Sequence, residues 1–334
     1  MDVSILIRSL NAEALLTRCL TALAKQQTKL RSEIVLLDCS SDDRTREIAR
    51  SFGVNIYTIP RNLFTFSSAL NAGAQLCRGE FMISLSADAV PAREDWLDTL
   101  IAPLLSSPNV TASFSRQVPW EQDPIPQQQE IATEFGEAAW LRDKANFQQL
   151  LNENLEPFAL LTFSNVSSCM RRDFILSHPF YELPYFEDRA FALDVLSAGT
   201  AFAYAPESVV YHSHAPHLPA ALSVSERGVV SRAAINREAA RRFNKPLENL
   251  FISTPRRALL EVPATFSRSA LKILKTLLIS RSASRRSEIA YYISQGGIAL
   301  GTLRAVTAVH QDGPLALKRS DPTKLFLQAR KDRT

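Results

Sequence analysis

Acidic side chains stand at the ends of several apolar runs in this chain, and carboxylates can bind cations or move protons. Asp38 closes EIVLLD, Asp88 stands in LSADAVP, and Glu187-Asp188 opens the helix-like stretch EDRAFALDVL. Asp38 could accept hydrogen bonds from a nucleobase or ribose, Asp88 could hold a divalent cation, and the acidic pair could supply a general base. A structural explanation is open for each, because such carboxylates also satisfy backbone N–H groups and the helix dipole.

Two histidines close another apolar run. VVYHSH places His212 and His214 two residues apart, and therefore on one face of an extended strand. A single buried histidine is usually structural. Two histidines that flank a serine at the end of an apolar run favour a ligand or phosphate contact.

Missing motifs exclude several other chemistries. The sequence has no GxGxxG after its first apolar run, no GxxxxGK[ST] phosphate loop, no GxSxG elbow and no spaced Cys/His set. Four scattered cysteines without a CxxC pair predict reduced thiols in a reducing compartment. A net charge of +4 on 334 residues is too small for a chain built to bind nucleic acid.

The elements that would position these residues alternate along the first part of the chain. Apolar runs of strand length alternate with helical spacing or capped helix patterns, which predicts an α/β fold: a doubly wound, mostly parallel sheet flanked by helices. Such sheets bind ligands beyond the carboxyl ends of their strands, so Asp38 and Asp88 should face one crevice. The expected strands are 3–7, 33–38, 54–60 and 80–88, and the expected helices begin at Asn11 or span 41–53, 67–77 and 93–105.

The middle of the chain is less regular. Residues 119–130 are rich in Pro and Gln and predict a loop, 132–155 predict a helix, and 161–214 predict mixed helix and strand. We place a boundary after this stretch, which gives a domain over 1–217 and a largely helical region over 218–334.

The helical region contains a basic amphipathic segment, 265–286, with six Lys or Arg residues, no acid, and leucines on one face. It could bind an anionic membrane surface. Alternatively, it could pack its leucines on the main domain and leave a solvated basic face. No signal peptide and no apolar run long enough to span a membrane are evident, so we expect a cytoplasmic protein, with peripheral contact at the inner face of the cell membrane if the segment binds lipid.

Taken in order, the motifs resemble a known family. VSILIRSLN, EIVLLDCSSDDRT, ALNAGAQLCRGEFMISLSADAVPAREDWL, FEDRAFALDVLSAG and APESVVYHSH are similar to the inverting, nucleotide-sugar-dependent glycosyltransferases of family 2, which have the GT-A fold. FSRQVPWEQDPIP and TFSNVSSCMRRD resemble the branch usually called rhamnosyltransferases. The resemblance covers about residues 2–215.

The resemblance implies a role for individual residues. Asp188, at the end of the ED motif with Glu187, matches the catalytic base, and Asp88 matches the last carboxylate of a metal-binding DxD motif. His212 matches a histidine near the diphosphate, and with its neighbour His214 it is a candidate metal ligand. Residues expected to bind the nucleotide, the sugar or the acceptor are Ser9, Asn11, Asp38, Asp43, Asn71, Asp88, Arg116, Gln117 and Asn165, and Arg171 or Arg172 could reach phosphates or lie on the solvated surface.

One position departs from the family pattern. Family members commonly read Asp-x-Asp where this chain reads Ser86-Ala87-Asp88, although the rhamnosyltransferase-like branch often has a small polar residue first. The resemblance still implies a divalent metal, Mg²⁺ or Mn²⁺.

The implied reaction is inverting transfer of a sugar from a nucleotide donor, with rhamnose from dTDP-rhamnose as the best candidate, to a glycan or lipid-linked glycan. Two other classes of protein are alternatives to it. A degenerate glycosyltransferase-like protein, acting as a non-catalytic nucleotide- or glycan-binding subunit or as a scaffold subunit, would explain Ser86. A sugar-phosphate nucleotidyltransferase would need a Gly-rich basic loop after the first strand, where this chain has RSLNAEALL.

Overall fold

The computed structural model describes residues 1–213, 218–245, 317–319, 321, 325–326 and 328–331. His214 and the basic segment 265–286 lie outside the described residues. The strands are β1 Val3–Ser9, β2 Ser32–Asp38, β3 Asn55–Thr58, β4 Phe81–Ser86, β5 Val90–Pro91, β6 Val110–Val118, β7 Trp140–Arg142, β8 Ser167–Arg171, β9 Ala201–Tyr211 and β10 Arg330–Lys331. The helices are α1 Glu13–Ala24, α2 Thr45–Ser51, the short 3-10 helix η1 Arg61–Leu63, α3 Phe66–Leu76, α4 Trp96–Ser106, α5 Ile125–Glu134, α6 Lys144–Asn152, α7 Pro157–Leu160, α8 Arg172–Ser177, α9 Glu187–Ser197 and α10 Leu218–Arg242.

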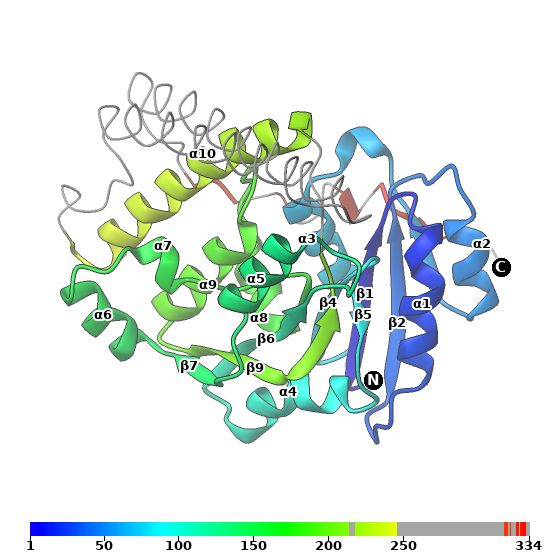
Figure 1. Ribbon diagram of the computed structural model, residues 1–334, viewed down its shortest axis with the longest axis horizontal. Coiled ribbons are helices and arrows are strands. Elements are labelled where there is room, and N and C mark those ends of the chain that lie inside the picture. The colour runs from blue at the N-terminus through cyan, green and yellow to red at the C-terminus, as the bar shows by residue number, and fades with distance from the viewer. Residues whose placement is uncertain (214–217, 246–316, 320, 322–324, 327, 332–334) are drawn as a thin grey trace, which may run out of the picture.

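These strands form one sheet in the order β10-β3-β2-β1-β4-β8-β6-β9-β5, and β7 pairs with β9. Strands β3, β2, β1 and β4 are parallel, as the alternation of strands and helices predicts. Strand β8 is antiparallel to β4 and β6, whereas β9 is parallel to β6. In Figure 1, α1 and α2 lie outside β1 and β2, and α6 and α7 lie at the other end of the molecule. The predicted α/β fold is confirmed.

Alternate side chains of the central strands face two different apolar cores, because successive residues of a strand point to opposite faces. In β1, Val3, Ile5 and Ile7 pack with residues of α1 and α4, while Leu6 packs with residues of α3 and α9. Strand β4 repeats the pattern, with Ile83 on the first face and Met82 on the second. Helices therefore cover both faces of the sheet, and even-numbered β1 residues belong to the α3 and α9 face.

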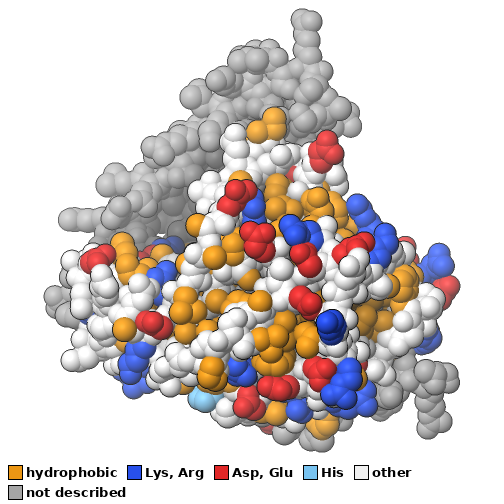
Figure 2. Space-filling view, turned by 90° about the horizontal axis from the view of Figure 1, so that it is seen from below, with side chains coloured by type: hydrophobic (Ala, Val, Ile, Leu, Met, Phe, Trp, Pro, Cys, Tyr) orange, Lys and Arg blue, Asp and Glu red, His pale blue; other side chains and the backbone are white. Residues whose placement is uncertain are grey.

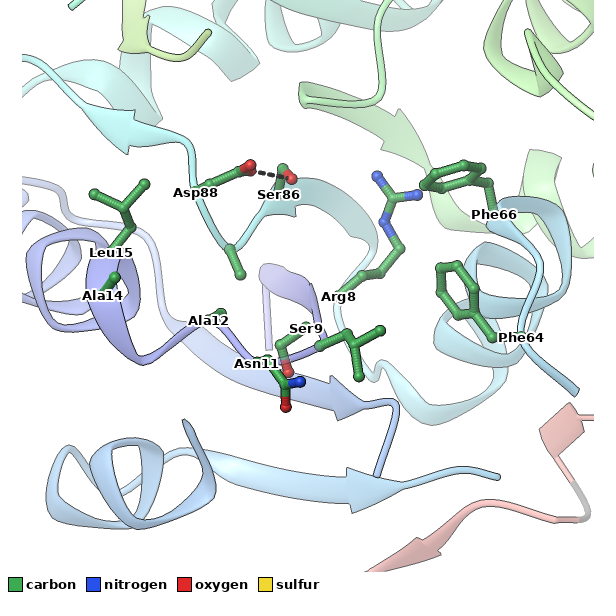
Figure 3. A pocket seen from close by; sticks show the side chains of 12 residues that line it. Arg8, Ser9, Asn11, Ala12, Ala14, Leu15, Phe64, Phe66, Ser86 and Asp88 are labelled. Atoms are coloured by element: carbon green, nitrogen blue, oxygen red, sulfur yellow. Dashed lines mark hydrogen bonds between the residues drawn. The ribbon is translucent and has the colours of Figure 1, made fainter. Parts of the chain in front are cut away.

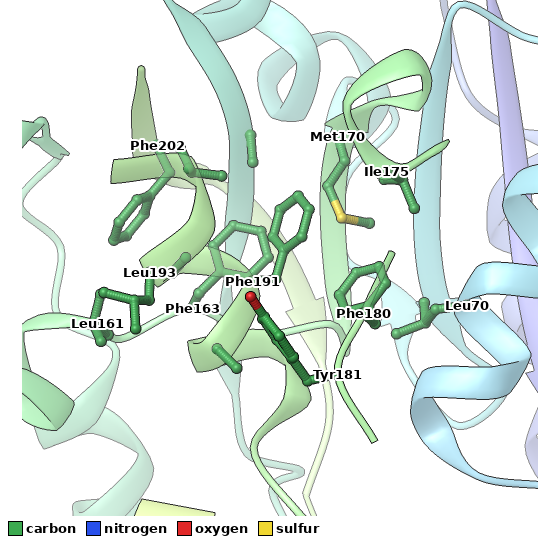
Figure 4. Close-up of a cluster of buried hydrophobic side chains, with 14 of the residues drawn as sticks. Leu70, Leu161, Phe163, Met170, Ile175, Phe180, Tyr181, Phe191, Leu193 and Phe202 are labelled. Atoms are coloured by element: carbon green, nitrogen blue, oxygen red, sulfur yellow. The ribbon is translucent and has the colours of Figure 1, made fainter. Parts of the chain in front are cut away.

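Aromatic packing fixes helix α9 on that second face (Figure 4). Phe191 is fully buried and stacks on Phe180, with the ring centroids 4.8 Å apart. Phe163 lies against the same ring at 5.8 Å. Because each aromatic side chain buries about 150–250 Å² of surface, this cluster holds α9 firmly and sets the position of its first turn.

Two predictions for the middle of the chain are wrong. Residues 119–130 are not all loop, because α5 begins at Ile125 with a proline in its first turn, where the missing N–H breaks no helical hydrogen bond. Residues 132–155 are not one helix. The segment leaves helical geometry after Glu134, pairs as β7 with β9, and becomes helical again as α6 from Lys144. Trp140 of β7 packs edge-on against Phe114 and Phe202, and this packing overrides local helix propensity.

Helix α10 and the last described residues contact the residues before 214 through polar side chains. Asp194 of α9 is 2% exposed and accepts hydrogen bonds from Arg242 at 2.7 Å, Arg319 at 3.0 Å and Tyr181 at 2.9 Å. Arg232 of α10 pairs with Glu156. In the part of the chain that is described, the regions on either side of residue 217 therefore share buried ion pairs. The division of the chain into domains at that residue stays a prediction.

The surface carries both signs of charge. On the face shown in Figure 2, acidic and basic side chains are interspersed around apolar ones and form no basic field. Among the described helices, none is both long and apolar enough to cross a membrane.

We expect Asp194→Ala to destabilise the fold by at least about 2 kcal/mol, because it removes the buried carboxylate that accepts hydrogen bonds from Arg242, Arg319 and Tyr181, although Arg242 keeps its pair with Glu238. Urea unfolding would measure the loss. The matched control is Asp95→Ala, which breaks the exposed Arg93–Asp95 pair and should cost less than about 1 kcal/mol. Equal losses in the two variants would show that the Asp194 contacts do not stabilise the junction.

Candidate active site

Two cavities open at the carboxyl ends of β1 and β4. The first, which we call the β1 cavity, has a volume of about 350 Å³ and is lined by residues 8–12, 14 and 15, by Phe64 and Phe66, and by residues 86–88 (Figure 3). The second, which we call the α9 cavity, has a volume of about 380 Å³ and is lined by residues of α5, by residues 162–166 before β8, by the start of α9, and by Gln117 and His212. Arg8, Phe66 and Ser86 line both cavities, so the cavities adjoin at these three residues.

Asp38 fastens the loop after β1 to the loop after β2. Its side chain is fully buried and accepts hydrogen bonds from the Ser9 hydroxyl at 3.1 Å, from the Ser41 hydroxyl at 2.5 Å and from the Ser41 N–H at 2.9 Å. The Asn11 N–H donates to Ser41 Oγ at 2.9 Å. Ser9 and Asn11 line the β1 cavity, whereas Asp38 lies behind them and does not line either cavity.

Asp43 has a similar position in the same pair of loops. Its carboxylate accepts the N–H of Glu13 at 3.0 Å and both the N–H and the hydroxyl of Thr45. The Thr45 hydroxyl oxygen in turn accepts the N–H of Ala12 at 2.8 Å. Asp38 and Asp43 thus shape the wall of the β1 cavity, and their predicted contacts with a nucleotide stay predictions.

Asp88 follows β4 and lies close to His212. The Ser86 hydroxyl donates to Asp88 Oδ1 at 2.5 Å, and His212 Nε2 lies 3.8 Å from the same oxygen. His212 Nδ1 is 2.8 Å from Gln117 Oε1, an acceptor, which places the ring proton on Nδ1 in the neutral imidazole and leaves Nε2 able to accept. The Gln117 side chain donates to Ser164 at 3.0 Å. The structure therefore brings together three of the predicted site residues.

The acidic pair opens α9 at the wall of the α9 cavity. Asp188 accepts the N–H of Arg189 at 2.8 Å and that of Asn165 at 3.4 Å, and the Asn165 side chain donates to Glu187 at 3.4 Å. Burial, joined by the charge of Glu187, raises the pKa of the Asp188 carboxyl to about 7, against the opposing effects of the Arg189 guanidinium and the two N–H groups. A carboxyl that titrates near neutral pH suits proton transfer.

Contacts from helix α10 support a strained turn just before the acidic pair Glu187-Asp188. Phe186, just before the pair, has a left-handed conformation with φ 62°, which is unfavourable for a bulky residue. The Ser231 hydroxyl oxygen of α10 accepts the N–H of Tyr185 at 3.1 Å. Gly228 of α10 faces the Phe186 ring so closely that an added Cβ would lie 3.2 Å from it.

Other predicted residues lie away from the cavities. Asn71 forms two hydrogen bonds with the backbone of Phe180, and Arg116 pairs with Glu137 at 3.0 Å. Neither lines the β1 or α9 cavity. Arg171 and Arg172 donate to backbone carbonyls, and Arg171 is paired with Phe81 at the opposite end of β4 from Asp88. This position does not favour the phosphate contact suggested for the two arginines.

Sequence reasoning missed Arg8 and Phe66. Arg8 is the one charged residue in the β1 run VSILIRS, and an arginine near the end of a buried strand was an available signal. Its guanidinium lies over the Phe66 ring, 5.6 Å from the centroid, and donates to the Asn165 carbonyl at 3.0 Å.

A divalent metal would find a partial set of ligands here. Asp88 offers a carboxylate and His212 an imidazole nitrogen, both of which are suitable ligands. Within the described residues, no three His, Cys, Asp or Glu side chains gather closely enough to hold a metal. The remaining ligands would have to come from a substrate or water, as is usual for Mg²⁺ bound with phosphates.

Comparison with known proteins identifies the class. The model of glycosyl transferase family 2 matches residues 4–175, just over half of the chain, and the chain belongs to this family. It is similar to the O-antigen chain rhamnosyltransferases RfbN of Salmonella typhimurium LT2 and WbaN of Salmonella anatum. Identity to RfbN is 27% over 64% of this chain and 67% of the relative, and identity to WbaN is 28% over 57% and 59%. The resemblance to the rhamnosyltransferase branch is thereby confirmed.

Solved structures support the same fold. The mannosyltransferase PcManGT from Pyrobaculum calidifontis, in complex with GDP-Man and Mn²⁺, has a TM-score of 0.55 at 15% identity and covers 90% of this chain and 87% of its own. S. aureus TarS 1-349 has a TM-score of 0.52 at 17% identity over 96% and 97%. The chain has the GT-A fold and is a nucleotide-sugar-dependent glycosyltransferase.

The raised pKa of Asp188 makes stability depend on pH. A carboxyl whose pKa is higher in the folded than in the unfolded chain stabilises the fold below its unfolded pKa, and this stabilisation is lost as the pH rises through about 7. Asparagine cannot ionise, so the free energy of unfolding of Asp188→Asn relative to wild type should increase between about pH 5 and about pH 8, by more than about 1 kcal/mol.

Urea unfolding at both pH values would measure this difference. Asp173→Asn is the matched control, because Asp173 also accepts the next N–H in the first turn of a helix but is exposed. A difference that is independent of pH in Asp188→Asn would contradict the raised pKa.

Proposed function

We propose that the protein is an inverting rhamnosyltransferase that moves rhamnose from dTDP-rhamnose to a glycan or lipid-linked glycan acceptor. The choice of sugar is supported by the two relatives, which are both described as O-antigen chain rhamnosyltransferases. The observation that carries the proposed mechanism is the position of Asp188, a carboxyl with a raised pKa in the wall of a cavity that adjoins the Asp88 site.

In this proposal the two cavities divide the substrates. The nucleotide occupies the β1 cavity against Ser9 and Asn11, and the acceptor enters the α9 cavity beside Asp188. The sugar lies between them, where Arg8, Phe66 and Ser86 border both spaces. Leaving group and attacking oxygen then lie on opposite sides of the anomeric carbon, as inversion requires.

Asp188 acts as the general base. It takes the proton of the acceptor hydroxyl while that oxygen forms a bond to the anomeric carbon, and the bond from this carbon to the phosphate oxygen breaks. The nucleoside diphosphate leaves with the electron pair. General base catalysis of this kind contributes about 10²–10⁴-fold to the rate. The N–H groups of Arg189 and Asn165 keep the carboxylate oriented.

Asp88 and His212 are the residues that would hold a divalent ion, with His214 as a further candidate outside the described residues. Such an ion, Mg²⁺ or Mn²⁺, would offset negative charge on the departing diphosphate. Gln117 fixes the ring of His212 through Nδ1, so that Nε2 faces Asp88. Orientation of this kind by a second residue is typical of histidine ligands.

We expect Asp188→Asn to lower the turnover number by about 10²–10⁴-fold while the affinity for the donor nucleotide stays near that of wild type. Transfer from dTDP-rhamnose can be followed by release of dTDP. Asp173→Asn is again the control and should keep full activity. Near-normal turnover in Asp188→Asn would rule out its role as the base.

A thermal-shift panel with dTDP, UDP and GDP, with and without Mn²⁺, tests the donor. A ligand that binds the native state raises the melting temperature, and we expect the largest shift with dTDP. Asp88→Ala should reduce the shift measured with Mn²⁺, because it removes the carboxylate that would hold the ion. Asp38→Ala should reduce it as well, since the loops that form the β1 cavity lose their shared acceptor. A larger shift with UDP or GDP would overturn the proposed donor.

A further inference from the structure

Arg8 is the least satisfied charged group at the site. Its Nη2 donates to the Asn165 carbonyl, but Nε and Nη1 are shielded from solvent and find no hydrogen-bond partner among the described residues. A buried cation without such partners is costly, so it usually marks a position where a ligand completes the contacts. In Figure 3 the guanidinium lies beside Phe66, at the border between the two cavities.

The register of the sheet explains why Arg8 lacks a carboxylate partner. Arg8 and Ser86 are directly paired residues of β1 and β4, and both line the two cavities. The Ser86 hydroxyl donates to Asp88 and so forms no ion pair with Arg8. An aspartate at position 86 could neutralise the guanidinium, whereas serine leaves its charge available.

The surrounding acids do not take up that charge directly. The negative charges that favour the protonated form of Arg8 from a distance are those of Glu187, Asp188 and Asp88. No carboxylate oxygen of the described residues lies within ion-pair distance of the Arg8 guanidinium. An arginine stays protonated at neutral pH, and its planar fork of N–H groups suits the paired oxygens of a phosphate. The unpartnered Nε and Nη1 lie on different edges of the guanidinium at the junction of the cavities, where each could donate to an oxygen of a diphosphate that joins a nucleoside in one cavity to a sugar near the other.

We propose that Arg8 is a built-in cation that binds the diphosphate of the donor, so that part of the affinity for the nucleotide does not require a divalent ion. The proposal rests on nucleotide-sugar dependence and holds whichever base and sugar the donor carries. Positions 86 and 8 therefore act together. Because position 86 is a serine and not an acid, the positive charge of Arg8 stays available for the phosphates.

The test measures binding of nucleoside diphosphates by calorimetry in excess EDTA, with whichever of dTDP, UDP and GDP binds wild type most tightly. Wild type should bind without metal. Arg8→Met should lose at least about tenfold in affinity for the diphosphate, and much less for the matching nucleoside, because charge-assisted hydrogen bonds to phosphate are lost. Arg8→Lys should keep part of the affinity, since it keeps the charge but not the fork.

Arg142→Met is the matched control. Arg142 also has a buried Nε without a hydrogen-bond partner in the described residues and lies over an aromatic ring, Trp140, at 5.3 Å, but it does not line the β1 or α9 cavity. Its substitution should leave the affinity for the diphosphate unchanged. Melting temperatures of the free variants would check that each is folded.

Three results would overturn the proposal. The first is a wild-type protein that binds nucleoside diphosphates only when Mn²⁺ is present. The second is an Arg8→Met variant that binds them in EDTA as wild type does, which would make Arg8 a counter-charge for the acidic pair. The third is a nucleoside affinity that falls as far as the diphosphate affinity. Tightest binding of UDP or GDP would contradict the dTDP donor and leave the role of Arg8 standing.

Discussion

The site depends on the parallel pairing of β1 between β2 and β4. This register places Ser9 opposite Asp38 on one side and Arg8 opposite Ser86 on the other. The first pair ties the loops after β1 and β2 together through a buried carboxylate, and the second sets the charge at the border of the two cavities. A slip of one residue would turn each of these side chains to the other face of the sheet. The backbone hydrogen bonds that join β1 to its neighbours therefore also position the side chains of the site.

Asn165 connects the junction of the two cavities to the acidic pair of α9. Its carbonyl accepts from Arg8, its N–H donates to Asp188, and its side chain donates to Glu187. One residue thus contacts both the cation at the border of the cavities and the proposed base. Since the residue is 2% exposed and lies just before β8, the contacts are supported by the sheet and not by a free loop.

Local sequence patterns predicted the alternating strands and helices and placed Asp38 and Asp88 at strand ends, because periodicity and strand termini are local properties. They could not show that Asp38 is enclosed by Ser9 and Ser41, since those partners belong to loops that meet only in the folded sheet. For the same reason the strand at Trp140 was missed, as its partners lie on β9. Side-chain environments arise from long-range pairing, which sequence spacing does not encode.

The close approach of Gly228 to the Phe186 ring bears on where this enzyme can be shortened. Phe186 holds a strained backbone angle immediately before the acidic pair, and α10 covers it with a residue that has no side chain. A fragment that ended before α10 would keep strands β1 to β9 and both acids. It would nevertheless release the ring and the Tyr185 N–H from their contacts and let the strained turn relax. A fragment that keeps these contacts therefore has to extend past the family match at residue 175 and include α10.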